Sequence, residues 1–159
     1  MNIFIVVGTQ EPFDRMIKII DAWASKNNKH RIFAQISKAA YKPKSFSFTE
    51  FISPELFDEH FNNADLIISH AGMGTIISAL TIGKPIIVMP RLAKNHEQRN
   101  DHQLATAKSF EKLGYVKAVY NETELIQALD EAEKIKVGKI IGPDASPQLI
   151  KALRNIINQ

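Results

Sequence analysis

Short runs of apolar residues alternate along this sequence with longer segments in which apolar residues recur every three or four positions. A strand that is covered on both faces has no polar side, so continuous apolar runs predict buried strands. Such runs occupy residues 3–7, 66–69 and 85–89, and residues 31–36 are predicted to form a further strand. An imperfect alternation over residues 45–51 and a short stretch over 115–120 predict two further strands.

Helical spacing fills the segments between these runs. The stripe Met16, Ile20 and Trp23 predicts a helix over residues 12–26 that turns this stripe toward the core. Ser53, followed by a proline, is typical of a helix that begins with serine as its N-cap. Further helices are predicted to open at Thr75, to cover 104–113, and to cover 122–133 and 146–157, the first two ended by Gly83 and Gly114.

The regular alternation of strands and helices predicts an α/β fold, a doubly wound and mostly parallel sheet with helices on both faces. Right-handed crossovers then bring the loops at residues 8–9, 70–75 and 90–91 to one edge of the sheet. A chain of 159 residues, 45% of them hydrophobic, can bury one substantial core. We therefore expect residues 1–159 to form a single domain.

The turn after the strand at 66–69 carries the most specific chemical signal. Gly72 and Gly74 have no Cβ atoms, so the backbone can turn tightly and a ligand can approach the peptide N–H groups. Unpaired N–H groups in the first turn of a helix suit a phosphate or diphosphate. An anionic nucleotide is the leading ligand class; alternatively, the two glycines serve only the packing of strand against helix.

Charge and composition narrow the functional classes. The net charge of +3 is modest and the lysines are scattered among acidic residues, so nucleic-acid binding is not indicated. The densest basic group, Lys38, Lys42 and Lys44, is either solvated loop surface or a contact with an acidic membrane. The absence of cysteine excludes a thiolate nucleophile and fits a reducing, cytoplasmic compartment. The apolar start is too short for a signal peptide or a membrane span.

The polar connection at residues 91–99 and the residues after it offer weaker signals. His96 and His102 do not share a helix face as a metal-binding pair would, so no metal site is expected. Glu97 and Asp101 would repel each other on a helix, which indicates that they lie in a loop or beside a basic neighbour such as Arg99. Asp101 alone, or Asn95 together with Gln98, is expected to act as a helix cap.

Several motifs together carry a family resemblance. Residues 69–75 (SHAGMGT), 83–88 (GKPIIV), 90–91 (PR) and 101–103 (DHQ) closely resemble the C-terminal, donor-binding half of family 28 glycosyltransferases. Residues 7–10 (VGTQ) and 12–15 (PFDR) resemble a narrower subgroup, the eukaryotic Alg13-type subunit and its bacterial exopolysaccharide and capsule counterparts of the PssE type. The resemblance extends from the first strand to about Gly114.

The resemblance implies the Rossmann-like C-terminal half of a GT-B enzyme, which binds a UDP-sugar and needs neither metal nor cofactor. It also implies a membrane-associated partner of the Alg14 or PssD type that supplies the acceptor site. The donor-binding residues that it implies are Gly8, Thr9, His70, Gly72, Met73, Gly74, Thr75, Ser78, Arg91, His102 and Gln103.

Within this set, Gly72, Gly74 and Thr75 are expected at the diphosphate, and His102 with Gln103 at the sugar and phosphates. Arg91 would frame the nucleotide, and Gly8 and Thr9 would face the cleft where the acceptor arrives. Ser78 departs from the family pattern, because many members have there a glutamate that binds the ribose hydroxyls. A serine is shorter and neutral, which leaves ribose recognition open. No catalytic base can be assigned.

The resulting expectation is the donor-binding subunit of an inverting glycosyltransferase. It would transfer a hexose or N-acetylhexosamine from a UDP-sugar to a lipid-linked acceptor, and its partner would hold it at the cytoplasmic face of the membrane. One alternative is a non-catalytic regulatory or scaffolding subunit that keeps the fold but binds nucleotide weakly. Another is a stand-alone phosphosugar-binding enzyme of the flavodoxin-like type.

Overall fold

The computed structural model describes residues 1–141, 150–151 and 153–155. In this part of the chain, six parallel strands form one sheet in the order β3-β2-β1-β4-β5-β6. They are β1 (Asn2–Val6), β2 (Arg31–Gln35), β3 (Ser47–Thr49), β4 (Leu66–His70), β5 (Ile86–Met89) and β6 (Lys117–Ala118). This is the strand order of dinucleotide-binding folds, and it differs from the flavodoxin-like order. The predicted α/β fold is confirmed.

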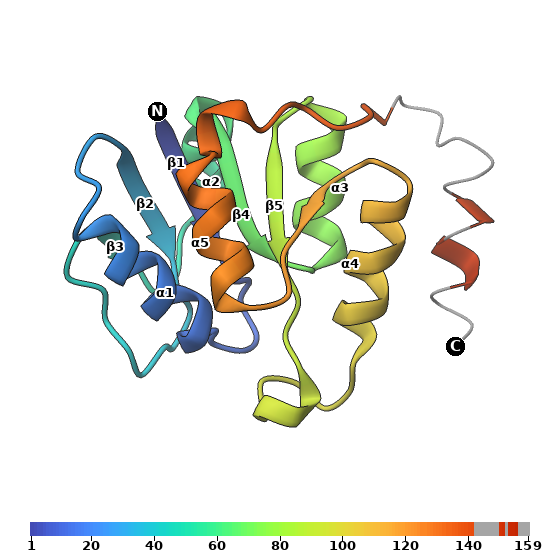
Figure 1. Ribbon diagram of the computed structural model, residues 1–159, viewed down its shortest axis with the longest axis horizontal. Helices are drawn as coiled ribbons and strands as arrows, with labels where there is room; N and C mark the ends of the chain where they lie inside the picture. The colour runs from blue at the N-terminus through green and yellow to red at the C-terminus, as the bar shows by residue number, and fades with distance from the viewer. Residues whose placement is uncertain (142–149, 152, 156–159) are drawn as a thin grey trace.

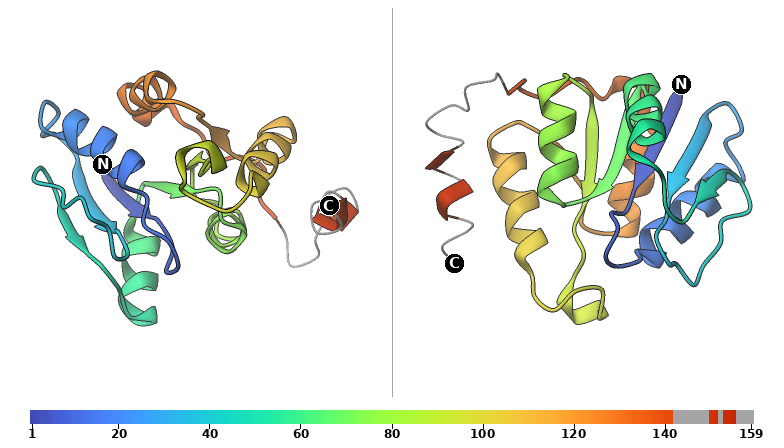
Figure 2. Two further views of the ribbon diagram at one scale, coloured as in Figure 1. Left: turned by 90° about the horizontal axis from the view of Figure 1, so that it is seen from below. Right: turned by 180° about the vertical axis from the view of Figure 1, so that it is seen from behind.

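Helices cover both faces of the sheet, as Figures 1 and 2 show. The helices α1 (Asp14–Ala24) and α5 (Glu122–Asp130) pack on one face. The helices α2 (Pro54–Asn63), α3 (Met73–Thr81) and α4 (His102–Lys112) pack on the other. Each face therefore has its own apolar core, and the sheet separates the two.

Side chains of the central strand β1 supply both cores in alternation. Ile3 and Ile5 point into the core beneath α1 and α5, whereas Phe4 and Val6 point into the core beneath α2, α3 and α4. This alternation follows from the pleat of a strand, in which successive side chains face opposite sides. The predicted stripe of α1, which includes Met16, is buried in the first of these cores.

Three helix ends follow the signals in the sequence. The hydroxyl oxygen of Ser53 accepts a hydrogen bond from the backbone N–H of Leu56 at 3.4 Å, which confirms the predicted N-cap of α2. Gly83 and Gly114 have φ angles of +67° and +75° just beyond the ends of α3 and α4. Both glycines thus adopt the left-handed conformation that commonly ends a helix.

Other helix boundaries differ from expectation. The helix α3 begins at Met73, two residues earlier than predicted, with Gly72 at its N-cap. Asp101 occupies the N-cap position of α4 without capping it, because its carboxylate accepts a hydrogen bond from the N–H of Ala93 instead. Ala93 opens the short 3-10 helix η1 (Ala93–Asn95), which also contains Asn95.

The C-terminal part of the chain is described in pieces. The predicted helix at 122–133 ends earlier, at Asp130, and a short 3-10 turn, η2 (Ala132–Lys134), follows it. The predicted helix at 146–157 lies mostly outside the described residues; positions 150–151 and 153–155 are helical. Within the described ranges, no helix combines the length and the apolar character needed to cross a membrane.

Candidate functional site

A hollow of about 260 Å³ opens at the carboxyl edge of the sheet. It lies where β1 and β4 are neighbours and their connections run to opposite sides, the position at which open α/β sheets bind ligands. Three connections line it: the loop between β1 and α1, the turn between β4 and α3, and the connection between β5 and α4 together with the start of α4. The sequence predicted that these loops would meet at one edge.

In the turn before α3, one backbone N–H group is already hydrogen-bonded within the protein, and the others remain available to a ligand. The N–H of Gly72 donates to the carbonyl of His70 at 2.8 Å and is therefore occupied. The N–H groups of Met73, Gly74 and Thr75 form the first turn of α3, and no side chain caps it. Since the positive end of the helix dipole lies here, these N–H groups suit an anion.

The imidazole of His70 lies between two glycines. A Cβ atom on Gly8 would come within 2.9 Å of the His70 ring, and one on Gly72 would come within 2.1 Å. A Cβ on Gly74, in contrast, would meet no atom within 4 Å. Gly8 and Gly72 therefore make room for the protein's own histidine, whereas Gly74 leaves the wall of the hollow open.

His70 is neutral at physiological pH. Its burial, with a smaller contribution from the charge of Arg91, lowers the pKa of the imidazole to about 4. The contact of Nδ1 with the carbonyl of Val6, at 3.4 Å, acts in the opposite direction and is the weaker effect. At the edge of the hollow, His70 thus provides an uncharged ring that can form hydrogen bonds.

Arg91 supplies the positive charge. Only 4% of this residue is exposed, and its guanidinium donates hydrogen bonds to the carbonyls of Val7, Glu11 and Pro12. It also lies over the ring of Phe13, 5.1 Å from the centroid. Arg91 therefore fastens the loop between β1 and α1, a task that the sequence did not indicate.

No carboxylate of the described residues forms an ion pair with this guanidinium. Among the described residues, the ion pairs do not include Arg91, although it lines the hollow. Burial lowers its pKa to about 10, which the charges of Glu11 and Glu97 partly oppose, so the group stays protonated. A buried cation that forms no direct ion pair in the described part of the chain favours an anionic ligand in the hollow.

Gln35 is a structural contributor that sequence reasoning missed. Its carboxamide accepts a hydrogen bond from the N–H of Gly8 at 3.1 Å and donates one to the Gly8 carbonyl at 2.9 Å. The carboxamide also donates to the carbonyl of Glu50. The sequence indicated this role only through the presence of a polar amide near the end of the predicted strand 31–36. Gln35 holds Gly8 beside His70.

The implied donor-binding residues do not all reach the hollow. Gln103 does, and its side-chain oxygen accepts a hydrogen bond from the N–H of Arg91 at 3.1 Å. His102 and Ser78 are exposed and lie outside the lining, and Met73 packs against the core. The residues that the structure brings together are Gly8, Thr9, His70, Gly72, Gly74, Thr75, Arg91 and Gln103.

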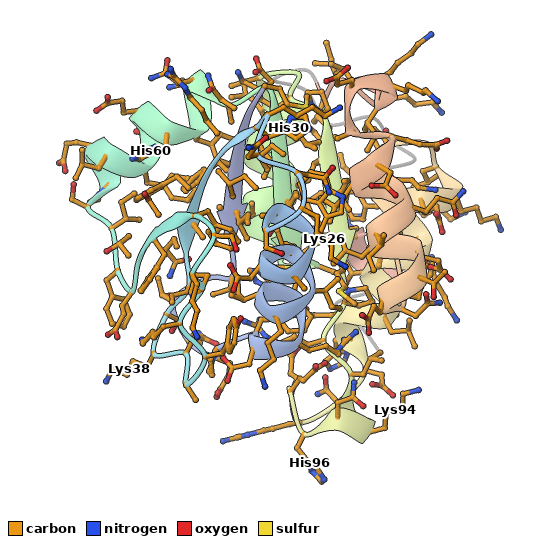
Figure 3. All side chains as sticks on the ribbon, turned by 60° about the vertical axis from the view of Figure 1, so that its left-hand side comes forward. Lys26, His30, Lys38, His60, Lys94 and His96 are labelled. Atoms are coloured by element: carbon orange, nitrogen blue, oxygen red, sulfur yellow. The ribbon has the colours of Figure 1, made fainter. Side chains whose placement is uncertain are left out.

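The connection between β5 and α4 is held by a partly buried ion pair. Glu97 lies in a loop, as predicted, and its carboxylate receives hydrogen bonds from Nε and Nη2 of Arg15 at 2.6 Å and 2.9 Å. The cation is thus Arg15 of α1 and not the neighbouring Arg99. His96, which precedes Glu97, is exposed, and Figure 3 shows it pointing outward from this end of the molecule.

A larger groove of about 710 Å³ lies on the other side of this ion pair, between α1, η1 and the start of α5. Acidic and basic side chains alternate in its walls, among them the paired Arg15 and Glu97. The uncapped first turn of α3 and the unpaired Arg91 are not part of it. The smaller hollow is therefore the better candidate for an anionic ligand.

The comparison with known families agrees with the geometry. Residues 2–138 match the family described as Glycosyltransferase family 28 C-terminal domain. The chain belongs to this family. The matched region includes every residue that lines the hollow.

Relatives and solved structures extend this result. The family 28 chain is 33% identical over 125 residues, 72% of its length, to the human UDP-N-acetylglucosamine transferase subunit ALG13. It spans 10% of that human protein and 39% and 31% of the next two curated relatives. The chain therefore matches less than half the length of each of these relatives.

Two structural similarities show the shared fold. An NMR solution structure of ALG13 superposes with a TM-score of 0.63 at 20% identity, covering 96% of this chain and 94% of that one. Acinetobacter baumannii MurG superposes with a TM-score of 0.59 at 24% identity, covering 84% of this chain and 40% of MurG. The fold described above is thus shared with nearly all of the ALG13 structure and with part of MurG.

Proposed function

We propose that this family 28 chain is the donor-binding subunit of a glycosyltransferase and binds a UDP-sugar in the hollow. The observation that carries the proposal is the meeting of two anion-attracting features, the uncapped first turn of α3 and the unpaired guanidinium of Arg91. A relative named as a UDP-N-acetylglucosamine transferase subunit supports this choice of donor. The sugar is a hexose or N-acetylhexosamine.

The same two features provide a chemical role. When the bond between the sugar and the diphosphate breaks, negative charge grows on the departing diphosphate. Fixed N–H dipoles and a buried cation stabilise such charge without reorganisation, which lowers the barrier to transfer. The neutral His70 beside them adds no charge of its own. The base that activates the acceptor is assigned to the partner.

A second protein supplies the acceptor half in this proposal. The chain superposes on 40% of the length of MurG, and the relatives that it matches are named as subunits of a transferase. The partner is a membrane-associated subunit of the Alg14 or PssD type and presents a lipid-linked acceptor. Residues 1–159 then form a single domain, held at the inner face of the membrane through the partner. Transfer proceeds with inversion and serves exopolysaccharide, capsule or lipid-linked sugar synthesis.

Thermal unfolding of the full chain tests donor binding. A ligand at 100 times its Kd stabilises the folded state by about 2.7 kcal/mol. We therefore expect millimolar UDP to raise the melting temperature by roughly 5–10 °C. Uridine, which lacks the diphosphate, is the matched control and should raise it much less. An unchanged melting temperature in millimolar UDP would contradict the proposal.

A scaffolding subunit with weak nucleotide binding is the second candidate. The position of Ser78 favours it, because this side chain is exposed and lies outside the hollow, away from any ribose bound there. Calorimetric titration with UDP-N-acetylglucosamine separates the two functions. Micromolar affinity supports the donor-binding subunit, whereas the absence of measurable heat supports the scaffold.

A further inference from the structure

Gln98 lines the hollow beside Arg91 and Gln103, although the sequence indicated no more for it than a role at a helix cap. It lies in the connection between β5 and α4, four residues before the helix begins. His102 and Gln103 were both expected to contact the sugar and phosphates, but only Gln103 lines the hollow. The neutral carboxamide of Gln98 lines it as well.

The carboxamide of Gln98 is not fixed by the protein. Its oxygen is buried and has no hydrogen-bond partner among the described residues. The oxygen of Gln103, in contrast, accepts from the N–H of Arg91, and both ends of Gln35 are bonded. A buried acceptor without a partner is unfavourable, and the terminal torsion of glutamine turns easily. A half-turn exchanges the positions of the oxygen and the nitrogen, so a ligand in the hollow that Gln98 lines can select either orientation.

The backbone beneath Gln98 is held firmly. The carboxylate of the adjacent Glu97 receives two hydrogen bonds from Arg15 and a third from the N–H of Leu92 at 2.9 Å. Arg15 also donates to the carbonyl of Pro90. Gln98 therefore combines a fixed position with a terminal group that a ligand can orient, as suits a residue that recognises a substrate.

Different groups in the hollow match the diphosphate and the sugar of a sugar nucleotide. A diphosphate offers only acceptors and is matched by the N–H groups of α3 and by the cation of Arg91. A sugar also offers donors, its hydroxyl groups and, where present, an acetamido N–H. The oxygen of a carboxamide can accept from these donors, whereas Arg91 and the N–H groups of α3 only donate.

We propose that Gln98 binds the sugar of the donor, its carboxamide oxygen accepting a hydrogen bond from a hydroxyl or acetamido group of that sugar. The proposal rests on the proposed donor-binding function. It makes Gln98 a specificity-determining residue that distinguishes a UDP-sugar from UDP alone.

The test is calorimetric titration of the full chain with UDP and with UDP-N-acetylglucosamine, for the natural protein and the variant Gln98→Met. Methionine keeps the length of the side chain and removes its hydrogen bonds. The matched control is Gln127→Met, the same change at an exposed position of α5. Far-ultraviolet circular dichroism and the melting temperature establish that each variant is folded.

We expect Gln98→Met to weaken the binding of UDP-N-acetylglucosamine about tenfold, to change that of UDP less than twofold, and Gln127→Met to change neither. Equal weakening for both ligands, or no weakening for either, would overturn the role of Gln98 while leaving donor binding intact. If the natural protein bound neither ligand, the proposed function itself would fail, and the role of Gln98 with it.

Discussion

Gly72 and Gly74 lie two positions apart and lack a side chain for different physical reasons. A Cβ on Gly72 would collide with the ring of His70, whereas a Cβ on Gly74 would extend into open space at the wall of the hollow. The sequence treated both glycines alike, with either the close approach of a ligand or the packing of strand against helix as the reason. Only the position of the His70 ring shows that Gly72 is required for packing against this ring, whereas Gly74 leaves space for a ligand.

Replacing Gly72 with alanine should destabilise the protein. The new methyl group would force the buried ring of His70 to move, and overpacking of this kind costs about 1–3 kcal/mol. Urea unfolding of Gly72→Ala against the natural protein measures the loss. A variant of unchanged stability would mean that the ring of His70 can leave its place between the two glycines without cost.

Replacing Gly74 with alanine should separate stability from binding. Gly74 lies in the first turn of α3, where alanine favours the helix by up to about 1 kcal/mol, so the variant should be at least as stable. The methyl group would nevertheless narrow the hollow, and we expect the Kd for UDP to rise about tenfold. Undiminished UDP binding by the stable variant would argue against a ligand at this wall.

His70 should make stability depend on pH. Its pKa is about 4 in the folded chain and near 6.5 when unfolded, so the fold favours the neutral ring. This contribution is complete above pH 6.5 and is lost as the pH falls toward 4. Between pH 7 and pH 5 it amounts to about 2 kcal/mol of unfolding free energy.

Urea unfolding at pH 7 and pH 5 tests this dependence. The natural protein should lose about 2 kcal/mol more than His70→Gln over this range, because glutamine does not titrate. The comparison uses differences between two pH values, so any loss of stability caused by the substitution itself cancels. Equal pH dependence of the two proteins would show that His70 is not buried as a neutral ring.

At the scale of elements, the ion pair between Arg15 and Glu97 joins α1 to the connection before α4. The side chains of Arg15 and Glu97 are 25% and 12% exposed, so water screens the pair only in part. Lys42 and Glu50 form a second ion pair of similar length, in which the side chains are 43% and 48% exposed. The two pairs allow the same substitution to be compared in different surroundings.

Glu97→Gln should lower the free energy of unfolding by about 1–3 kcal/mol, because a charged acceptor of three hydrogen bonds is lost. Glu50→Gln, the matched control, should change it by less than about 1 kcal/mol. Denaturant titration of both variants measures the difference. Equal effects would mean that the ion pair between Arg15 and Glu97 does not hold the connection in place.

At the scale of the whole molecule, the carboxyl edge of the single sheet would form one wall of the proposed active site, and the proposed partner would form the other. The hollow is open at the carboxyl edge, and the uncapped turn of α3 faces it. A subunit of this kind should bind a nucleotide alone, because its anion-attracting groups all lie within one chain. It should not transfer sugar alone, because in the proposed complex the acceptor and the base belong to the partner.

Co-expression with the protein encoded beside its gene tests this division of labour. We expect release of UDP from UDP-N-acetylglucosamine or another UDP-sugar only when both proteins and a lipid-linked acceptor are present. The control is the chain alone with the same donor and acceptor. Full turnover by the isolated chain would contradict the two-subunit arrangement.

Local features of the sequence determined much of the fold. Apolar runs placed the strands, and helical spacing placed the stripe of α1, because these periods repeat within a few residues. Gly83 and Gly114 indicated helix ends through their freedom to adopt positive φ angles. Ser53 indicated a start through the reach of its hydroxyl. Such effects act between neighbours in the chain and can therefore be read from it.

Tertiary structure alone decided which polar side chains meet. Gln35 holds Gly8 across 27 residues, Arg15 reaches Glu97 across 82, and Arg91 reaches Val7 across 84. Gln98 enters the hollow while His102 does not, because the path of the connection before α4 sets which side chain points inward. Such contacts depend on strand order and helix packing, which no local pattern encodes, so the sequence predicted the edge of the site but not its full set of residues.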